Sequence, residues 1–218
     1  MTRSKALSLL ALLALVALAP AAVAQSGRIE ITPTLGYRFG GTVSTANSSY
    51  INSIDVPDAL SFGLTAEYAV QPNLNVEFLW SHQDTELKAD FKGTPPASVK
   101  SSISHLNIDT IQIGGLWQSG RNGDKVRGYF DLLFGASILT PSPQYSTLTR
   151  FSATIGGGAK FQVSDKIGVR LGLRWMPVYI NSQDSGYVYC DPYWGCYQYY
   201  DSNYLYQTDA HVGLIIKF

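Results

Sequence analysis

Eight segments in which apolar and polar residues alternate predict an all-β protein: an eight-stranded antiparallel up-and-down transmembrane β-barrel. Two further observations support this fold class. The connections between the segments alternate between short turns and long polar loops, and an apolar export signal precedes the first segment. Strands that cross a membrane must close into a barrel, because lipid cannot form hydrogen bonds with the free edge of a sheet.

The N-terminal signal is predicted to be a cleaved signal peptide. Arg3 and Lys5 form a positively charged start, an apolar run follows, and Ala22-Val23-Ala24 has the small-x-small pattern of a cleavage site. The alternative is a membrane anchor, but the apolar run is shorter than the roughly 20 residues that a spanning helix needs. We therefore expect residues 1–24 to be the signal peptide and residues 25–218 to form one exported β-barrel domain.

Each predicted strand has one face of large apolar residues and one face of small, polar or charged residues. In the second segment, for example, Leu60, Phe62 and Leu64 share a face opposite Ser61 and Gly63. The eight segments span residues 28–39, 60–70, 74–81, 109–117, 126–138, 151–163, 167–175 and 204–218. The alternation sets both the number of strands and the side that each residue faces.

Two local features depart from this regular pattern. Leu106 and Ile108 are out of phase with the segment that follows them, which predicts a β-bulge near Asp109. The run Gly156-Gly157-Gly158 lies in the middle of a predicted strand, where glycine lets neighbouring groups pack closely.

The connections differ in length on the two sides of the predicted barrel. Short turns near residues 71, 121 and 165 alternate with polar loops over residues 40–58, 85–102, 140–149 and 181–203. Membrane barrels have short turns on one side and long loops on the other. A soluble sandwich gives no reason for this asymmetry.

The large apolar faces are predicted to contact lipid and the polar faces to line the lumen, because an eight-stranded barrel has room inside only for side chains. Aromatic residues at the strand ends are expected to form the two interfacial girdles. These residues are Tyr37, Phe39, Tyr68, Trp80, Trp117, Phe161, Trp175, Tyr204 and Phe218.

The predicted lumen contains nearly equal numbers of acidic and basic side chains. They are Glu30, Glu67, Glu77, Asp131 and Asp209 against Arg38, Arg127, Lys160, Arg170, Arg174 and Lys217. Buried charges are tolerated when they are paired, so we expect a plugged lumen in which Arg170 and Arg174 bridge to Glu67, Glu77 or Asp131. A narrow channel lined by charges is the alternative.

The two ends of the barrel domain carry the motifs that resemble a known family. The chain ends in Gly213-Leu214-Ile215-Ile216-Lys217-Phe218, with a terminal aromatic residue, and residues 31–39 read I-x-P-x-L-G-Y-R-F. Over residues 27–218 the chain resembles the small OmpA/OmpX-like outer-membrane β-barrel superfamily. The resemblance implies export to the bacterial outer membrane, with Phe218 as the assembly signal that the outer-membrane assembly machinery reads. It also implies contact with outer-membrane lipid and lipopolysaccharide.

The last long loop contains the only two cysteines, Cys190 and Cys196, which are predicted to form a disulfide because the domain is exported. A metal site is the alternative, but no histidine lies nearby. Aromatic residues surround the pair and are candidates for binding a surface ligand: Tyr189, Tyr193, Trp194 and Tyr197. The alternative is that these rings extend the interfacial girdle or pack against lipopolysaccharide sugars.

Members of the superfamily serve as structural proteins, adhesins, surface antigens, channels for small hydrophobic compounds and, in some cases, lipid-modifying enzymes. An enzyme of that kind would use one of the three histidines, His82, His105 or His211, with a serine. His82 and Ser81 are neighbours on one strand and therefore face opposite ways, whereas Asp84 shares the face of His82 and could orient its ring. We expect no catalysis, cofactor, metal or nucleic-acid partner, and a monomeric barrel with a structural or surface-interaction role. A narrow solute channel is the second candidate function, and a lipid-modifying enzyme the third.

Overall fold

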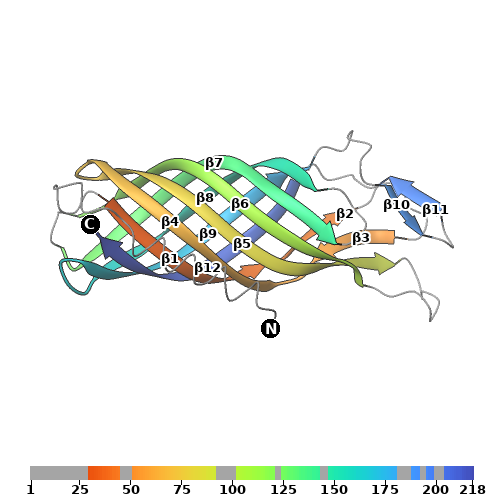
Figure 1. The fold of residues 1–218 in the computed structure, drawn as a ribbon, viewed down its shortest axis with the longest axis horizontal. Coiled ribbons are helices and arrows are strands. Elements are labelled where there is room, and N and C mark those ends of the chain that lie inside the picture. The colour runs from red at the N-terminus through yellow and green to blue at the C-terminus, as the bar shows by residue number, and fades with distance from the viewer. Residues whose placement is uncertain are drawn as a thin grey trace, which may run out of the picture.

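The computed structural model describes residues 29–44, 51–91, 102–120, 124–142, 147–180, 188–191, 195–198 and 204–218. Eight antiparallel strands form a closed barrel (Figure 1). They are β1 (Ile29–Phe39), β4 (Ala59–Gln71), β5 (Leu74–Phe91), β6 (Ser102–Gln118), β7 (Val126–Ser142), β8 (Leu148–Gln162), β9 (Ile167–Tyr179) and β12 (Tyr204–Lys217). Each barrel strand pairs with the next one along the chain, which confirms the predicted architecture.

The first and last strands close the barrel. β1 pairs with β12 over a register that includes Leu35 opposite Val212 and Arg38 opposite Asp209. The backbone N–H of Phe218 donates to the carbonyl of Ile29 at 3.0 Å. No strand edge is left unpaired along this seam, as a lipid environment requires.

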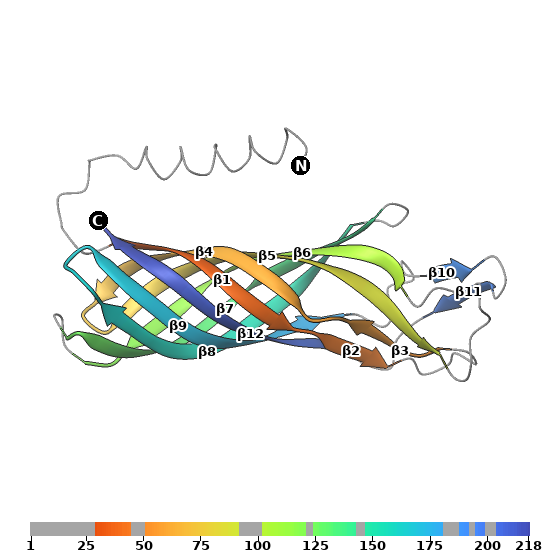
Figure 2. The ribbon, with the colours of Figure 1, turned by 90° about the horizontal axis from the view of Figure 1, so that it is seen from below.

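Four short strands lie in segments that the sequence predicted to be loops. They are β2 (Gly41–Ser44), β3 (Ile51–Val56), β10 (Val188–Asp191) and β11 (Gly195–Gln198). β3 pairs with the last residues of β5, β2 pairs with β3, and β10 and β11 form a separate hairpin. Figure 2 shows the C-terminus at one end of the barrel and β10 and β11 at the other. We call these the turn end and the loop end. Within the described ranges, no helix is long and apolar enough to cross a membrane.

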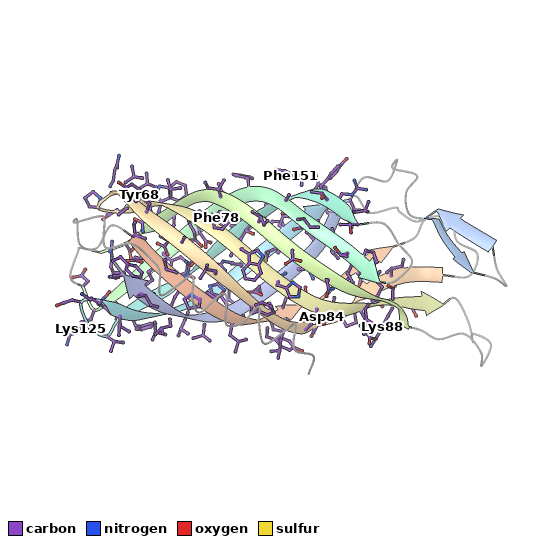
Figure 3. All side chains as sticks on the ribbon, viewed as in Figure 1. Tyr68, Phe78, Asp84, Lys88, Lys125 and Phe151 are labelled. Carbon is purple, nitrogen blue, oxygen red and sulfur yellow. The ribbon has the colours of Figure 1, made fainter. Side chains whose placement is uncertain are left out.

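The outer face of the barrel is apolar from one aromatic girdle to the other. Figure 3 shows Tyr68 near the turn end and Phe78 in the middle projecting outward. The exposed aromatic residues at the turn end are Tyr68, Trp117, Phe130, Phe161 and Phe218. Those at the loop end are Tyr37, Phe39, Phe151, Trp175, Tyr179, Tyr204 and Tyr206. In water this surface would be a large aggregation-prone patch, whereas in lipid it is the favourable one.

The predicted bulge near Asp109 is absent. The β5–β6 and β6–β7 registers run without a shift past Asp109, and the shift in β5–β6 falls between Leu87 and Lys88 instead. Leu106 and Ile108 face inward and are buried, in phase with the inward-facing Thr110. The strand register therefore continues, and what changes near residue 109 is which face of the strand is apolar.

This reversal also explains why the strands are longer than predicted. β5 continues to Phe91, although its predicted segment ended at residue 81. Beyond that point its outward residues are polar, and Asp84 and Lys88 project outward toward the loop end (Figure 3). The strands leave the lipid here, so the barrel becomes polar outside and apolar inside, as in a soluble barrel.

The three consecutive glycines of β8 have different roles. A Cβ on Gly156 would overlap the Asp131 carboxylate, and a Cβ on Gly158 would overlap the backbone carbonyl of Leu171. A Cβ on Gly157 would lie 3.1 Å from the carbonyl oxygen of Tyr129, a contact that small shifts relieve. Close packing was predicted for all three glycines, but it requires glycine only at Gly156 and Gly158.

Adjacent alanine substitutions test this difference. We expect Gly158→Ala to lower the free energy of unfolding by about 1–3 kcal/mol, because β8 and β9 must separate to admit the methyl group. Gly157→Ala should cost less than about 1 kcal/mol. Equilibrium unfolding in urea, followed by tryptophan fluorescence in detergent micelles, measures both. Equal costs for the two variants would contradict the assigned roles.

Candidate functional site

The lumen holds a network of buried ion pairs with Arg170 of β9 at its centre. The guanidinium of this fully buried side chain donates to Glu67 at 3.0 Å, to Glu77 at 3.1 Å and to Asp131 at 2.9 Å. It also lies 4.2 Å from the centre of the Tyr129 ring. One cation thus connects carboxylates from β4, β5 and β7, and a charge-assisted contact to each of them offsets the cost of burial.

Arg174, four residues further along β9, points into the same space. Its Nη2 donates to Glu77 at 3.0 Å and its Nε lies 3.6 Å from Asp131. The predicted bridges from Arg170 and Arg174 across the lumen are therefore present. Gly172 lies between the two arginines on the inward face, and the space that its side chain would fill is occupied by the Tyr129 hydroxyl and the His211 ring.

Toward the turn end, lysine replaces arginine as the central cation. The Lys160 ammonium donates to Glu30 at 2.7 Å and to Glu67 at 2.5 Å. Lys217 lies 3.4 Å from the other oxygen of Glu30, and the Asn75 amide donates to Glu67 at 2.8 Å. Because Glu67 contacts both Lys160 and Arg170, this layer and the central one form one connected network.

Toward the loop end, a further ion pair lies across the seam that closes the barrel. Arg38 of β1 contacts Asp209 of β12 at 3.3 Å and donates to the Ser81 hydroxyl at 2.9 Å. Asp209 also accepts from the Ser61 hydroxyl at 2.5 Å and lies 3.5 Å from the His211 ring. The Arg38–Asp209 pair therefore links the first and last strands through side chains as well as backbone.

Arg127 lies outside this network, in contrast to the prediction. It is half-exposed at the turn end, where it donates to the backbone carbonyls of Ser119 at 3.4 Å and Pro72 at 3.1 Å. Arg127 is the second residue of β7, so alternation places it on the inward face, but at the turn end, outside the enclosed lumen. The ten remaining predicted lumen charges are five acids and five bases, so the enclosed network is formally neutral.

The lumen also contains neutral side chains that form hydrogen bonds with one another. Gln112 accepts from Thr154 at 2.5 Å and donates to Ser152 at 2.9 Å. Elsewhere in the lumen, the Gln207 amide donates to the side-chain oxygen of Gln83 at 3.1 Å. Leu79 and Leu133, both fully buried, fill the space among these groups.

The loop end of the lumen is closed by an apolar cluster that was not predicted from the sequence. Its buried members are Val56, Leu106, Ile108, Leu139, Val178, Ile180 and Leu205, with Leu87 packed against them. The signal that could have revealed it was the phase change at Leu106 and Ile108, which was read as a bulge. The lumen is thus filled by ion pairs and neutral polar groups, and at its loop end by aliphatic side chains.

The three histidines have different surroundings, and His105 is exposed on β6 opposite Glu86. His82 faces outward, its Nδ1 lies 2.9 Å from Asp109, and its ring lies 4.9 Å from that of Phe62. The sequence had suggested Asp84, not Asp109, as the partner of His82. The residues directly opposite His82 on the neighbouring strands are Phe62 and Asp109, neither of which is the serine that a lipid-modifying enzyme of the predicted kind would pair with it. His211 is buried in the lumen, 3.3 Å from the Tyr129 hydroxyl.

The loop candidates lie partly within the described structure. Cys190 and Cys196 are directly opposite each other in the β10–β11 hairpin, and so are Tyr189 and Tyr197. Opposite positions on paired strands are within the Cα separation that a disulfide requires, so the disulfide remains a prediction compatible with this register. Tyr193 and Trp194 lie outside the described residues, as does the predicted signal peptide. In the described segments, no group of three His, Cys, Asp or Glu side chains is placed to hold a metal ion.

The closed sheet, the apolar outer belt and the filled lumen define an eight-stranded transmembrane β-barrel. Residues 8–218 match the family described as outer membrane protein beta-barrel domain, and the chain belongs to this family. A comparison with curated proteins gave no match.

Solved structures share this fold at low sequence identity. Neisserial surface protein A is 11% identical, with a TM-score of 0.53, over 88% of this chain and 99% of that chain. The N-terminal barrel domain of Pseudomonas aeruginosa OprF is 13% identical, with a TM-score of 0.50, over 89% of this chain and 100% of that chain. The P. aeruginosa outer membrane protein OprG is 8% identical, with a TM-score of 0.53, over 88% of this chain and 96% of that chain.

Proposed function

We propose that this protein is a non-enzymatic barrel of the outer membrane whose lumen is closed to solutes and whose function lies in its long loops. The observation that carries the proposal is that buried charged, polar and aliphatic side chains fill the lumen. An ion crossing it would have to displace the buried contacts of Arg170 and then pass the apolar cluster. Each of these steps costs free energy, because the charges would lose their partners and the ion its hydration.

The long-loop surface is the remaining place for recognition, since loops on a rigid scaffold carry binding residues in many folds. Tyr189 and Tyr197 are directly opposite on the β10–β11 hairpin, which lies at the loop end (Figure 2). Tyrosine and tryptophan provide rigid contact area at low entropic cost. We place a structural and surface-interaction role here, with lipopolysaccharide or an unidentified surface ligand as the partner. The signal peptide, the assembly role of Phe218 and a monomeric state belong to the same proposal.

The decisive measurement is the single-channel conductance of the refolded protein in a planar bilayer. We expect no stepwise openings, because the buried ion pairs, polar groups and apolar cluster close the lumen. Heat-dependent mobility on denaturing gels, measured on the same sample, establishes that the barrel is folded, and a known porin serves as the positive control. Steady and reproducible openings of the folded protein would overturn the proposal in favour of the narrow-channel function.

A further inference from the structure

The outer face of the barrel contains a groove of about 730 Å³ that the lumen and the loops do not explain. It crosses β8, β9, β12, β1 and β4, and Figure 2 shows β9, β12 and β1 side by side on this face. The outward-facing side chains along it are almost all aliphatic. They are Leu35, Tyr37, Leu60, Ala159, Leu171, Leu173, Ala210 and Val212, and Gly157 adds bare backbone.

The groove arises from the order of residue sizes across the strands. One row of directly opposed residues runs from Gly157 to Leu173, Ala210, Tyr37 and Leu60. Over the first four positions of this row small residues alternate with large ones, so a hollow at Ala210 lies between Leu173 and Tyr37, and a hollow at Gly157 lies between Leu173 and Phe130 of β7.

The wall behind the groove is thin. Gly36, Gly158 and Gly172 take the inward positions of the next row, so only backbone separates the groove from the lumen there. A side chain at Gly172 would overlap the Tyr129 hydroxyl and crowd the His211 ring. The hollow therefore arises where small outward-facing residues coincide with inward-facing glycines in the barrel wall.

The groove runs obliquely between the middle of the belt and the loop end. Gly157 lies five residues before the end of β8 at the turn end, whereas Leu60 lies eleven residues before the end of β4. With roughly 3.4 Å per residue and a strand tilt of about 40°, these positions differ in height by roughly 15 Å. That height is half of the roughly 30 Å hydrocarbon core of a bilayer, the thickness of one leaflet.

We propose that this groove binds one acyl chain of a lipid whose head group lies at the loop end. The groove lies within the lipid-facing belt and is lined by aliphatic side chains, so a hydrocarbon chain is the chemical match. A second barrel would need a much larger buried surface, of order 1,000 Å². At the loop-end side of the groove, the Tyr37 hydroxyl donates to Asp58 at 3.4 Å, where the aliphatic lining gives way to polar groups.

Photo-crosslinking tests the proposal directly. The wild-type protein is folded into phosphatidylcholine vesicles that contain a phosphatidylcholine with a diazirine on one acyl chain, irradiated, and mapped by mass spectrometry. We expect cross-links at the lining residues of β9, β12 and β1 to exceed several-fold those at Ile113 and Phe134, which are exposed on β6 and β7 outside the groove. Uniform labelling around the belt of the wild-type barrel would overturn the proposal without any variant.

A matched pair of variants sharpens the test. Ala210→Leu fills the groove and should reduce its labelling to the level of the rest of the belt. Ala136→Leu adds the same group on β7, opposite Ile111 and Phe151, and should leave the labelling unchanged. Unchanged labelling in the folded Ala210→Leu variant would contradict a bound chain. The result does not depend on whether the lumen conducts, so this proposal and the proposed function can fail separately.

Discussion

Replacing Arg170 by methionine is expected to lower the free energy of unfolding by about 3–5 kcal/mol, the cost of leaving buried charges without their partner. Arg170 is fully buried and contacts Glu67, Glu77 and Asp131 at 2.9–3.1 Å. Methionine fills a similar volume, so the loss comes from electrostatics more than from packing. Three carboxylates would then share only Lys160 and Arg174, and they would repel one another.

Equilibrium unfolding in urea, with refolding to show reversibility, measures this cost. Arg127→Met is the matched control, because it removes the same side chain from a half-exposed site and should cost about 1 kcal/mol. A double variant that also carries Glu77→Gln should recover part of the loss, and the corresponding cycle gives the coupling energy. If Arg170→Met and Arg127→Met cost the same, the central role of Arg170 in the network is wrong.

Removing Asp209 is expected to have the second large effect. Asp209→Ala leaves the Arg38 guanidinium, which is 1% exposed, without its carboxylate 3.3 Å away, and removes the acceptor for the Ser61 hydroxyl. We expect the free energy of unfolding to fall by about 3 kcal/mol or more. Because the pair joins β1 and β12, the loss weakens the seam that closes the barrel.

The matched control for Asp209 is Asp109. This carboxylate also has a close ionisable partner, His82 at 2.9 Å, but it faces outward and its side chain is 34% exposed. Asp109→Ala should therefore cost less than about 1 kcal/mol. The same urea titrations compare the two variants, and Asp209→Asn should fall between them because it keeps a hydrogen-bond acceptor but not the charge. A cost for Asp209→Ala as small as that for Asp109→Ala would exclude a stabilising seam contact.

The sequence could predict the strands because the relevant signal is local. Within lipid, successive residues of a strand face hydrocarbon and lumen in turn, so apolar and polar residues must alternate. The turn-end boundaries of β1, β5, β7 and β9 lie within one residue of the predicted ones for this reason. The prediction stopped short at the loop end, where β5 and β6 leave the lipid and the alternation reverses. There the assumption that apolar residues face outward no longer holds.

The partners within the lumen depended on tertiary structure. The inward position of Arg170 follows from alternation, but its contact with Glu77, 93 residues earlier, depends on how the strands tilt and stagger around the barrel. The same stagger places Arg127 below the enclosed network, although its strand face is the inward one. It also pairs His82 with Asp109 of the next strand, where the local sequence had suggested Asp84.

By itself, the sequence determined that this chain forms an eight-stranded barrel with an apolar exterior and a charged lumen. Period-two alternation and the order of short and long connections are properties of the linear chain, so they were sufficient. Only the tertiary structure decided how the lumen is filled, that Leu106 and Ile108 belong to an apolar cluster, and that small residues from β8 and β12 form a groove. Each of these features requires side chains from several strands to meet, and barrel closure and stagger determine which ones do.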